Sequence, residues 1–140
     1  MNLARISKLL RVVKARSRLE QSRFVAVKTA QQTLIAEATA IESSAREALA
    51  VGEELNGQAL KSYGLRQKLL EKAAQERREK ARSLDPHKAT HQAALLASLR
   101  QETAWKSLSD AAEQERREET NAREEERREA FVQIRDPENF

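Results

Sequence analysis

The clearest pattern in the first third of the chain is a series of mostly apolar positions spaced alternately by four and three residues. The positions that follow this alternation are 6, 10, 13, 17, 20, 24, 27, 31, 34, 38, 41, 45, 48, 52 and 55. Eleven of these fifteen are apolar, whereas a chain that is 39% hydrophobic would place about six there by chance. This heptad spacing predicts a long helix whose apolar seam packs against another helix.

A single chain reversal is predicted after this helix. The glycines Gly52, Gly57 and Gly64 lie within thirteen residues of one another, and Asn56-Gly57 is a strong turn signal. We therefore expect an all-α fold, a long antiparallel two-helix coiled-coil hairpin formed by residues 1–140. Its expected parts are helix one at about 2–55, a turn at about 56–62, a longer helix two at about 62–134 and a tail at 135–140.

The ends of these helices have their own signals. Asn2 is a reasonable N-cap for helix one, and Asp136-Pro137 ends helix two. Asp85-Pro86 interrupts helix two, because Asp followed by Pro is also a good helix start. We expect a kink or short interruption of one long helix near Pro86, and a separate third helix is the alternative.

The position of the turn also predicts which residues face each other. A turn centred near residue 57 places residue i beside about residue 114 − i. Residues 1–28 would then lie beside about 86–113, and residues beyond about 114 would extend past helix one. The polar seam residues Ser17, Glu20, Gln31 and Gly52 either set the register of the pairing or mark a surface for a partner.

Composition supports a thin seam rather than a thick core. The chain is 34% charged and 4% aromatic, and it has three glycines and two prolines. It contains no cysteine, which excludes disulfides and fits a reducing compartment. Cations interrupt the first nineteen residues, so no secretory signal is expected there, and no apolar window approaches the ~20 residues of a membrane span. We expect a cytoplasmic protein with at most peripheral membrane contact.

The net charge of +4 hides an asymmetry along the chain. Residues 1–28 carry eight cations against one acid, whereas residues 110–140 carry eleven acids against six arginines. From 110 to 130, fourteen of twenty-one residues are charged, and pairs such as Glu113 with Arg117 favour a helix at i,i+4 spacing. A chain with a basic beginning and an acidic end can pair its own ends or bind two different partners.

The sequence contains none of the common phosphate-binding, nucleophile or zinc-binding motifs. The phosphate-binding sequences G-x-x-x-x-G-K-[ST] and G-x-G-x-x-G are absent, as is the nucleophile elbow G-x-S-x-G. His87 and His91 are four residues apart, but without further ligands we interpret them as a solvent-exposed pair. The sequence predicts no catalytic residue, no cofactor, no metal site and no small-molecule substrate.

Two aromatic residues have candidate roles. Trp105, the sole tryptophan, is expected to anchor the hairpin seam. Tyr63, near the expected tip of the hairpin, is a candidate for partner contact or for capping the tip.

The order of these features resembles the FliJ family of flagellar export proteins and the YscO-type stalk proteins of type III secretion. The matching segments are Leu9 to Val13, Arg18 to Glu20, the Ala/Gln/Glu-rich run from Ala30 to Ala50, Tyr63 with Leu65 and Leu69, Arg100 to Leu108, and the Glu/Arg-rich run from Glu113 to Arg128. The sequence from Asp136 to Phe140 departs from the family, whose members usually end with further acidic residues.

The resemblance implies a non-catalytic coupler between an export ATPase hexamer and a membrane export gate protein. It implies that Arg5, Lys8, Arg11 and Arg18 steer one end of the hairpin onto acidic loops of the ATPase ring. It also implies that Leu55, Tyr63 and Leu65 make apolar contacts with the gate. Such a chain would be cytoplasmic, peripheral to the inner-membrane export apparatus, and monomeric when free.

Two other functions remain open from the residues themselves. The same seam could join two chains, which would make the protein a self-associating structural scaffold or a peripheral-stalk subunit. The basic residues of 1–28 could instead bind nucleic acid or an anionic membrane. Nucleic acid is disfavoured because no aromatic residue interleaves with the stripe Arg11, Lys14 and Arg18.

Overall fold

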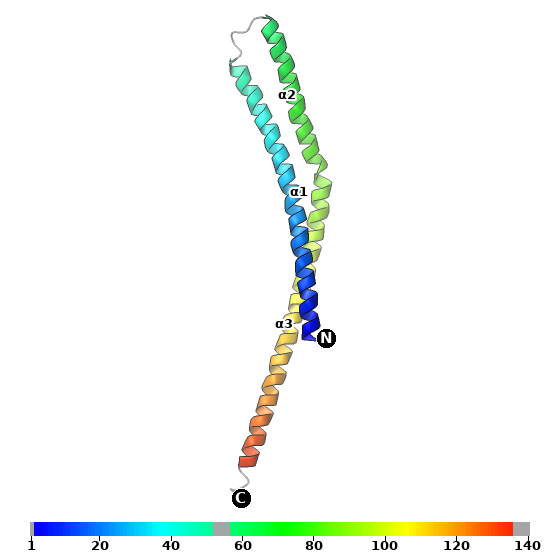
Figure 1. Cartoon of the computed structure of the whole chain (residues 1–140), viewed down its shortest axis with the longest axis vertical. Helices are drawn as coiled ribbons and strands as arrows, with labels where there is room; N and C mark the ends of the chain where they lie inside the picture. The colour runs from blue at the N-terminus through cyan, green and yellow to red at the C-terminus, as the bar shows by residue number, and fades with distance from the viewer. Residues whose placement is uncertain (1, 52–56, 136–140) are drawn as a thin grey trace. The chain divides into compact units, whose positions relative to one another are not determined.

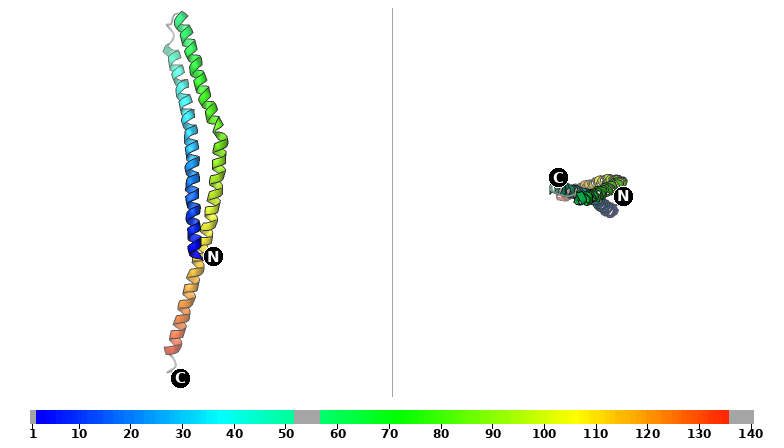
Figure 2. Two further views of the ribbon diagram at one scale, coloured as in Figure 1. Left: turned by 45° about the vertical axis from the view of Figure 1, so that its right-hand side comes forward. Right: turned by 90° about the horizontal axis from the view of Figure 1, so that it is seen from above.

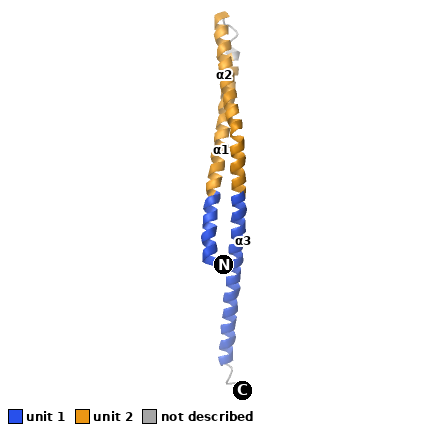
Figure 3. Ribbon diagram, turned by 90° about the vertical axis from the view of Figure 1, so that its right-hand side faces the viewer, with its two compact units in different colours: residues 1–17, 97–140 blue, residues 18–96 orange. Residues whose placement is uncertain are grey.

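The computed structural model describes residues 2–51 and 57–135, and it shows an all-α helical hairpin (Figure 1). Its helices are α1 (Leu3–Val51), α2 (Gly57–Ser83) and α3 (Asp85–Arg135). Contacts divide the chain into two units (Figure 3). Unit 1 comprises residues 1–17 and 97–140, and unit 2 comprises residues 18–96.

Helix α1 begins as the sequence predicts. The side-chain oxygen of Asn2 accepts a hydrogen bond from the Ala4 N–H at 3.2 Å, and its carbonyl accepts the Arg5 and Ile6 N–H groups. Asn2 is therefore the N-cap, because it supplies acceptors to N–H groups that have no partner within the helix.

The predicted seam of α1 is confirmed. All thirteen heptad positions from Ile6 to Ala48 are buried or half-buried. Positions 52 and 55 lie outside the described residues. The deepest side chains on this seam include Ile6 and Ala38, which are 3% and 0% exposed.

In unit 2, α1 lies antiparallel to α2 and to the start of α3 (Figures 1 and 2). The Gln31 amide donates to the Ala81 carbonyl at 3.0 Å, and the Gln67 amide donates to the Ala45 carbonyl at 3.0 Å. The residue numbers add up to 112 in both pairs, and they add up to 114 for the ion pair of Glu37 with Arg77. The predicted pairing of residue i with about 114 − i is confirmed in this unit.

The second helix begins earlier than predicted. Residues 57–62, expected in the turn, are the first residues of α2, and Gly64 is also helical. Residues 58–61 are Gln-Ala-Leu-Lys, which have good helix propensity, and Ala59 is half-buried, so this segment favours a helix. The remainder of the predicted turn lies outside the described residues.

The predicted interruption near Pro86 is present. Leu84 separates α2 from α3, and α3 continues α2 with a bend (Figure 1). The alternation of fours and threes continues through this break without a phase shift, because every such position from Tyr63 to Ala112 is buried or half-buried. The α2–α3 break therefore bends one arm of the hairpin and does not reverse the chain.

In unit 1, the start of α1 pairs with α3. Ile6, Ser17 and Ser98 are buried here, and the Ser17 hydroxyl has no hydrogen-bond partner in the part of the chain that is described. Side chains of α3 remain half-buried as far as Ala112, and every described side chain from Glu113 to Ile134 is exposed. The predicted extension past about residue 114 is confirmed, and α3 ends at Arg135, within one residue of expectation.

Candidate functional site

The first three turns of α1 carry the basic residues Arg5, Lys8 and Arg11. All three are exposed, and none forms an ion pair with any other described residue. They lie on the face of α1 turned away from the seam residue Ile6. The electrostatic potentials of these three cations add together. This end of unit 1 therefore presents a positive surface suited to acidic groups of a partner.

Arg18 belongs to the other unit. It is exposed and also forms no ion pair among the described residues, but it lies in unit 2, whereas Arg5, Lys8 and Arg11 lie in unit 1. The structure thus brings three of the four predicted ring-binding cations together on one unit and leaves Arg18 as a separate position.

The three residues predicted to contact the gate have different environments. Leu65 is 64% exposed on the outer face of α2, where it lines a shallow hollow with Lys61 and Lys68. Tyr63 is half-buried on the seam, and its hydroxyl accepts a hydrogen bond from the Gln67 amide at 2.9 Å. Leu55 lies outside the described residues. Of the two described residues, Leu65 has the exposed apolar side chain that a partner contact requires.

Trp105 and the two histidines lie on α3. Trp105 is half-buried on the seam of unit 1, as predicted. The prediction of a solvent-exposed histidine pair is wrong for His91, because this residue occupies a seam position and is half-buried, whereas His87 is exposed. Among the described residues, no group of three or more His, Cys, Asp or Glu side chains could hold a metal ion.

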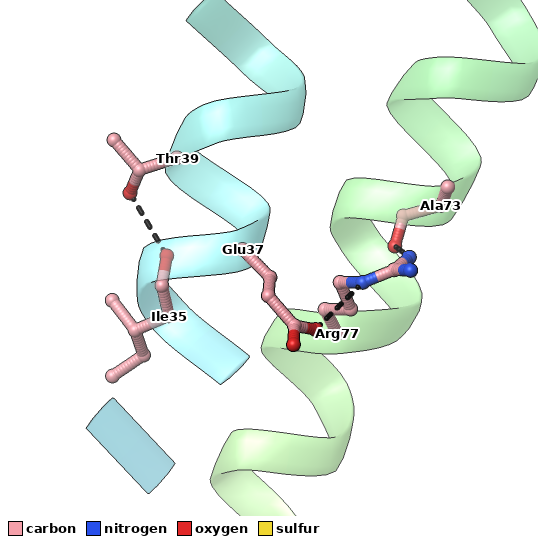
Figure 4. A network of polar contacts seen from close by, with 5 residues as sticks. All are labelled: Ile35, Glu37, Thr39, Ala73 and Arg77. Carbon is pink, nitrogen blue, oxygen red and sulfur yellow. Dashed lines mark hydrogen bonds and ion pairs between the residues drawn. The ribbon is translucent and has the colours of Figure 1, made fainter. Parts of the chain in front are cut away.

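Two ion pairs join α1 to α2 in unit 2. The Arg77 guanidinium donates to the Glu37 carboxylate at 3.0 Å and to the Ala73 carbonyl at 3.3 Å (Figure 4). The Arg78 guanidinium donates to both oxygens of Glu42 at 3.0 and 2.9 Å. This bidentate hydrogen bonding lowers the pKa of Glu42 and raises the pKa of Arg78.

The end of α3 carries exposed apolar side chains that the sequence reasoning did not select. Phe131, Val132 and Ile134 are 64%, 57% and 75% exposed. They follow a run of charged residues in which no seam position is apolar between Ala112 and Ala130. The signal was available in the sequence, because bulky apolar residues after a segment that has no partner helix are expected to be exposed.

Among the described residues, no helix is long and apolar enough to cross a membrane. Comparison with known proteins found no family model, curated protein or solved structure that matches the chain.

Proposed function

We propose that this chain is a non-catalytic coiled-coil stalk or adaptor of a bacterial flagellar or type III protein export ATPase, and that it couples the ATPase ring to the export gate. The observation that carries the proposal is the all-α helical hairpin, because members of the family that the chain resembles form an antiparallel two-helix coiled coil. The resemblance spans almost the whole chain and supplies the candidate partners.

The basic end of unit 1 is the proposed ring contact. Arg5, Lys8 and Arg11 are exposed and form no ion pair with another described residue, so they can steer this end towards acidic ring loops. Arg18 contributes from unit 2 as an additional cation. An association driven by exposed charges weakens as salt rises, because the Debye length falls to ≈ 8 Å at physiological ionic strength.

The exposed face of α2 is the proposed gate contact. Leu65 and Leu69, four residues apart, are 64% and 68% exposed and form an apolar pair on a helix whose seam side is occupied. Tyr63 is half-buried on the seam, and its hydroxyl accepts a hydrogen bond from Gln67. We therefore expect Tyr63 to hold α2 in place behind this surface and not to contact the gate itself.

The test is stimulation of ATP hydrolysis by a purified export ATPase hexamer. The parent chain should increase hydrolysis while having no ATPase activity itself, and the triple variant Arg5→Glu, Lys8→Glu, Arg11→Glu should lose most of this stimulation. A matched control reverses three exposed cations of α2, Arg66→Glu, Lys68→Glu and Lys72→Glu, and should stimulate like the parent. Equal stimulation by both triple variants would contradict the proposed ring contact.

Sedimentation velocity separates the stalk from the alternative scaffold. A stalk of this kind should remain a monomer of 15.9 kDa as its concentration is raised a hundredfold. A concentration-dependent dimer together with absent ATPase stimulation would favour a self-associating structural coiled coil.

A further inference from the structure

The break between α2 and α3 weakens the backbone connection within one arm of the hairpin. Pro86 has no N–H to donate to the Arg82 carbonyl, and its ring crowds that carbonyl. Backbone hydrogen bonds connect Leu84 to both sides of the break. The Leu84 N–H donates to the Ala81 carbonyl at 3.2 Å, and the Lys88 N–H donates to the Leu84 carbonyl at 2.8 Å. A continuous α-helix would have an N–H to i−4 carbonyl bond at every residue.

One side chain from α1 contacts both sides of this break. Gln31 lies on the seam and is 9% exposed. Its Nε2 donates to the Ala81 carbonyl near the end of α2 at 3.0 Å, and it also donates to the Asp85 carboxylate at the first residue of α3. A glutamine amide has two N–H groups, so both of its donors are used here.

A second seam glutamine, Gln67, allows the hydrogen bonds of Gln31 to be compared with those of a glutamine away from the break. Gln67 donates across the seam to the Ala45 carbonyl at 3.0 Å, just as Gln31 donates to the Ala81 carbonyl. The second bond of Gln67 goes to Tyr63 in its own helix, whereas the second bond of Gln31 goes to Asp85 beyond the break. Contact with the two sides of the α2–α3 break therefore distinguishes Gln31 from Gln67.

We propose that Gln31 and Asp85 form a latch that holds the α2–α3 break in one bent geometry, and that this arm hinges at Leu84 when the latch is open. A buried amide whose acceptors move away would leave unsatisfied donors, which is costly, so the latch favours the single arrangement in which both acceptors are in place. The bend is thus a fixed joint that a partner could release by competing for Asp85.

The test measures the geometry of the joint directly. The natural chain has no cysteine, so Glu76→Cys and Gln92→Cys, both exposed and both in unit 2, introduce two spin labels on opposite sides of the break. Pulsed electron paramagnetic resonance should give a narrow distance distribution in the parent and a broader one after Gln31→Leu. The matched control Gln67→Leu removes a seam glutamine elsewhere and should leave the distribution narrow.

Hydrogen exchange gives a second readout of the same joint. Gln31→Leu removes both hydrogen bonds of the Gln31 amide and should accelerate exchange of the Leu84 and Lys88 amides by at least about tenfold. Gln67→Leu should not accelerate exchange at these two amides. Faster exchange spread evenly over the chain, or a Gln31→Leu distribution as narrow as that of the control, would overturn the latch.

A second variant, Gln31→Glu, tests the latch while keeping a polar side chain at position 31. Gln31→Glu has nearly the same shape but turns an acceptor towards the Ala81 carbonyl and the Asp85 carboxylate, so the joint should open. Adding Asp85→Asn returns a donor and should narrow the distance distribution again. Failure of the second substitution to narrow it would also overturn the latch. This outcome is independent of ATPase stimulation, which tests the proposed function.

Discussion

At the scale of single residues, alanine allows glutamine to bond across the seam. Ala74 and Ala81 are 2% and 3% exposed, and Ala45 is 8% exposed. A methyl side chain buries little apolar area but lets the partner helix come close enough for an amide to reach a backbone carbonyl. The bonds of Gln31 to Ala81 and of Gln67 to Ala45 are both of this kind. The seam therefore derives specificity from hydrogen bonds as well as from apolar burial.

The Glu42–Arg78 ion pair makes stability depend on pH in a defined direction. The folded-state pKa of Glu42 lies below its ordinary value of 4.5, so the pair stabilises the fold fully above that value. The contribution is lost as the pH falls below 4.5 through the lowered pKa. Both side chains are more than a third exposed, so the effect is expected to be small.

We predict that Glu42→Gln reduces the loss of thermal stability between pH 7 and pH 3. The substitution removes the group whose protonation breaks the pair, so the variant should be less stable than the parent at pH 7 and similar to it at pH 3. Thermal unfolding followed by circular dichroism at both pH values measures this. A Glu42→Gln variant that loses as much stability on acidification as the parent would refute the prediction.

At the scale of helices, the sequence predicts the first arm of the hairpin better than the second. The α1 seam is visible because ten of its thirteen positions from Ile6 to Ala48 are apolar. The seam of α2 and α3 includes Gln67, Arg77, Lys88 and Glu102, so its apolar signal is diluted. Exposed leucines such as Leu65 add apolar residues outside the seam. Because the seam positions of this second arm could not be identified from the sequence, its local patterns did not predict which of its side chains are buried and which are exposed.

The same difficulty limited the prediction of candidate site residues. Exposure of Arg5, Lys8 and Arg11 follows from the α1 seam, because they fall outside it. Tyr63 and Leu65 looked alike in the sequence, but the phase of the second arm puts Tyr63 on the seam and Leu65 on the outer face. The bond from Gln31 to Asp85 depends on the pairing of residues 54 positions apart, which no local pattern specifies.

We predict that Pro86→Ala strengthens the connection between α2 and α3. Alanine supplies an N–H that can reach the Arg82 carbonyl, and it removes the ring that crowds this carbonyl. The variant should show a higher unfolding midpoint and slower exchange of amides next to the break. His87→Ala, at the adjacent exposed position, is the control. A midpoint that falls below that of the control would contradict this explanation of the break.

At the scale of the whole chain, the end of α3 is dispensable for the stability of the hairpin. In unit 1, burial along α3 stops at Ala112, and every described side chain from Glu113 to Ile134 is exposed. These residues bury no apolar area against α1, so they contribute little to the free energy of folding. Pairs such as Glu113 with Arg117 have the i,i+4 spacing that supports an isolated helix.

We predict that a chain shortened to residues 1–112 unfolds at nearly the same temperature as the full chain. The removed residues carry ten acidic and six arginine side chains, so the net charge rises from +4 to +8. Thermal unfolding measures the midpoint, and high ionic strength serves as the control for the altered charge. A fall of several degrees at high salt would show that the end of α3 stabilises the hairpin through contacts beyond those described.

The carboxylate of Asp85 also disfavours a slide of the two arms past each other by one heptad. A heptad seam repeats every seven residues, so a slide by one heptad would bring Gln31 opposite Ala74 and Gln67 opposite Ala38. Both glutamines would again face an alanine, and the alanine carbonyls alone could not distinguish the two alignments. Asp85, however, would be replaced opposite Gln31 by Arg78, whose guanidinium has only donors. The acidic side chain at the break thus acts with the Glu37–Arg77 and Glu42–Arg78 ion pairs against an alignment that the alanine carbonyls alone would tolerate.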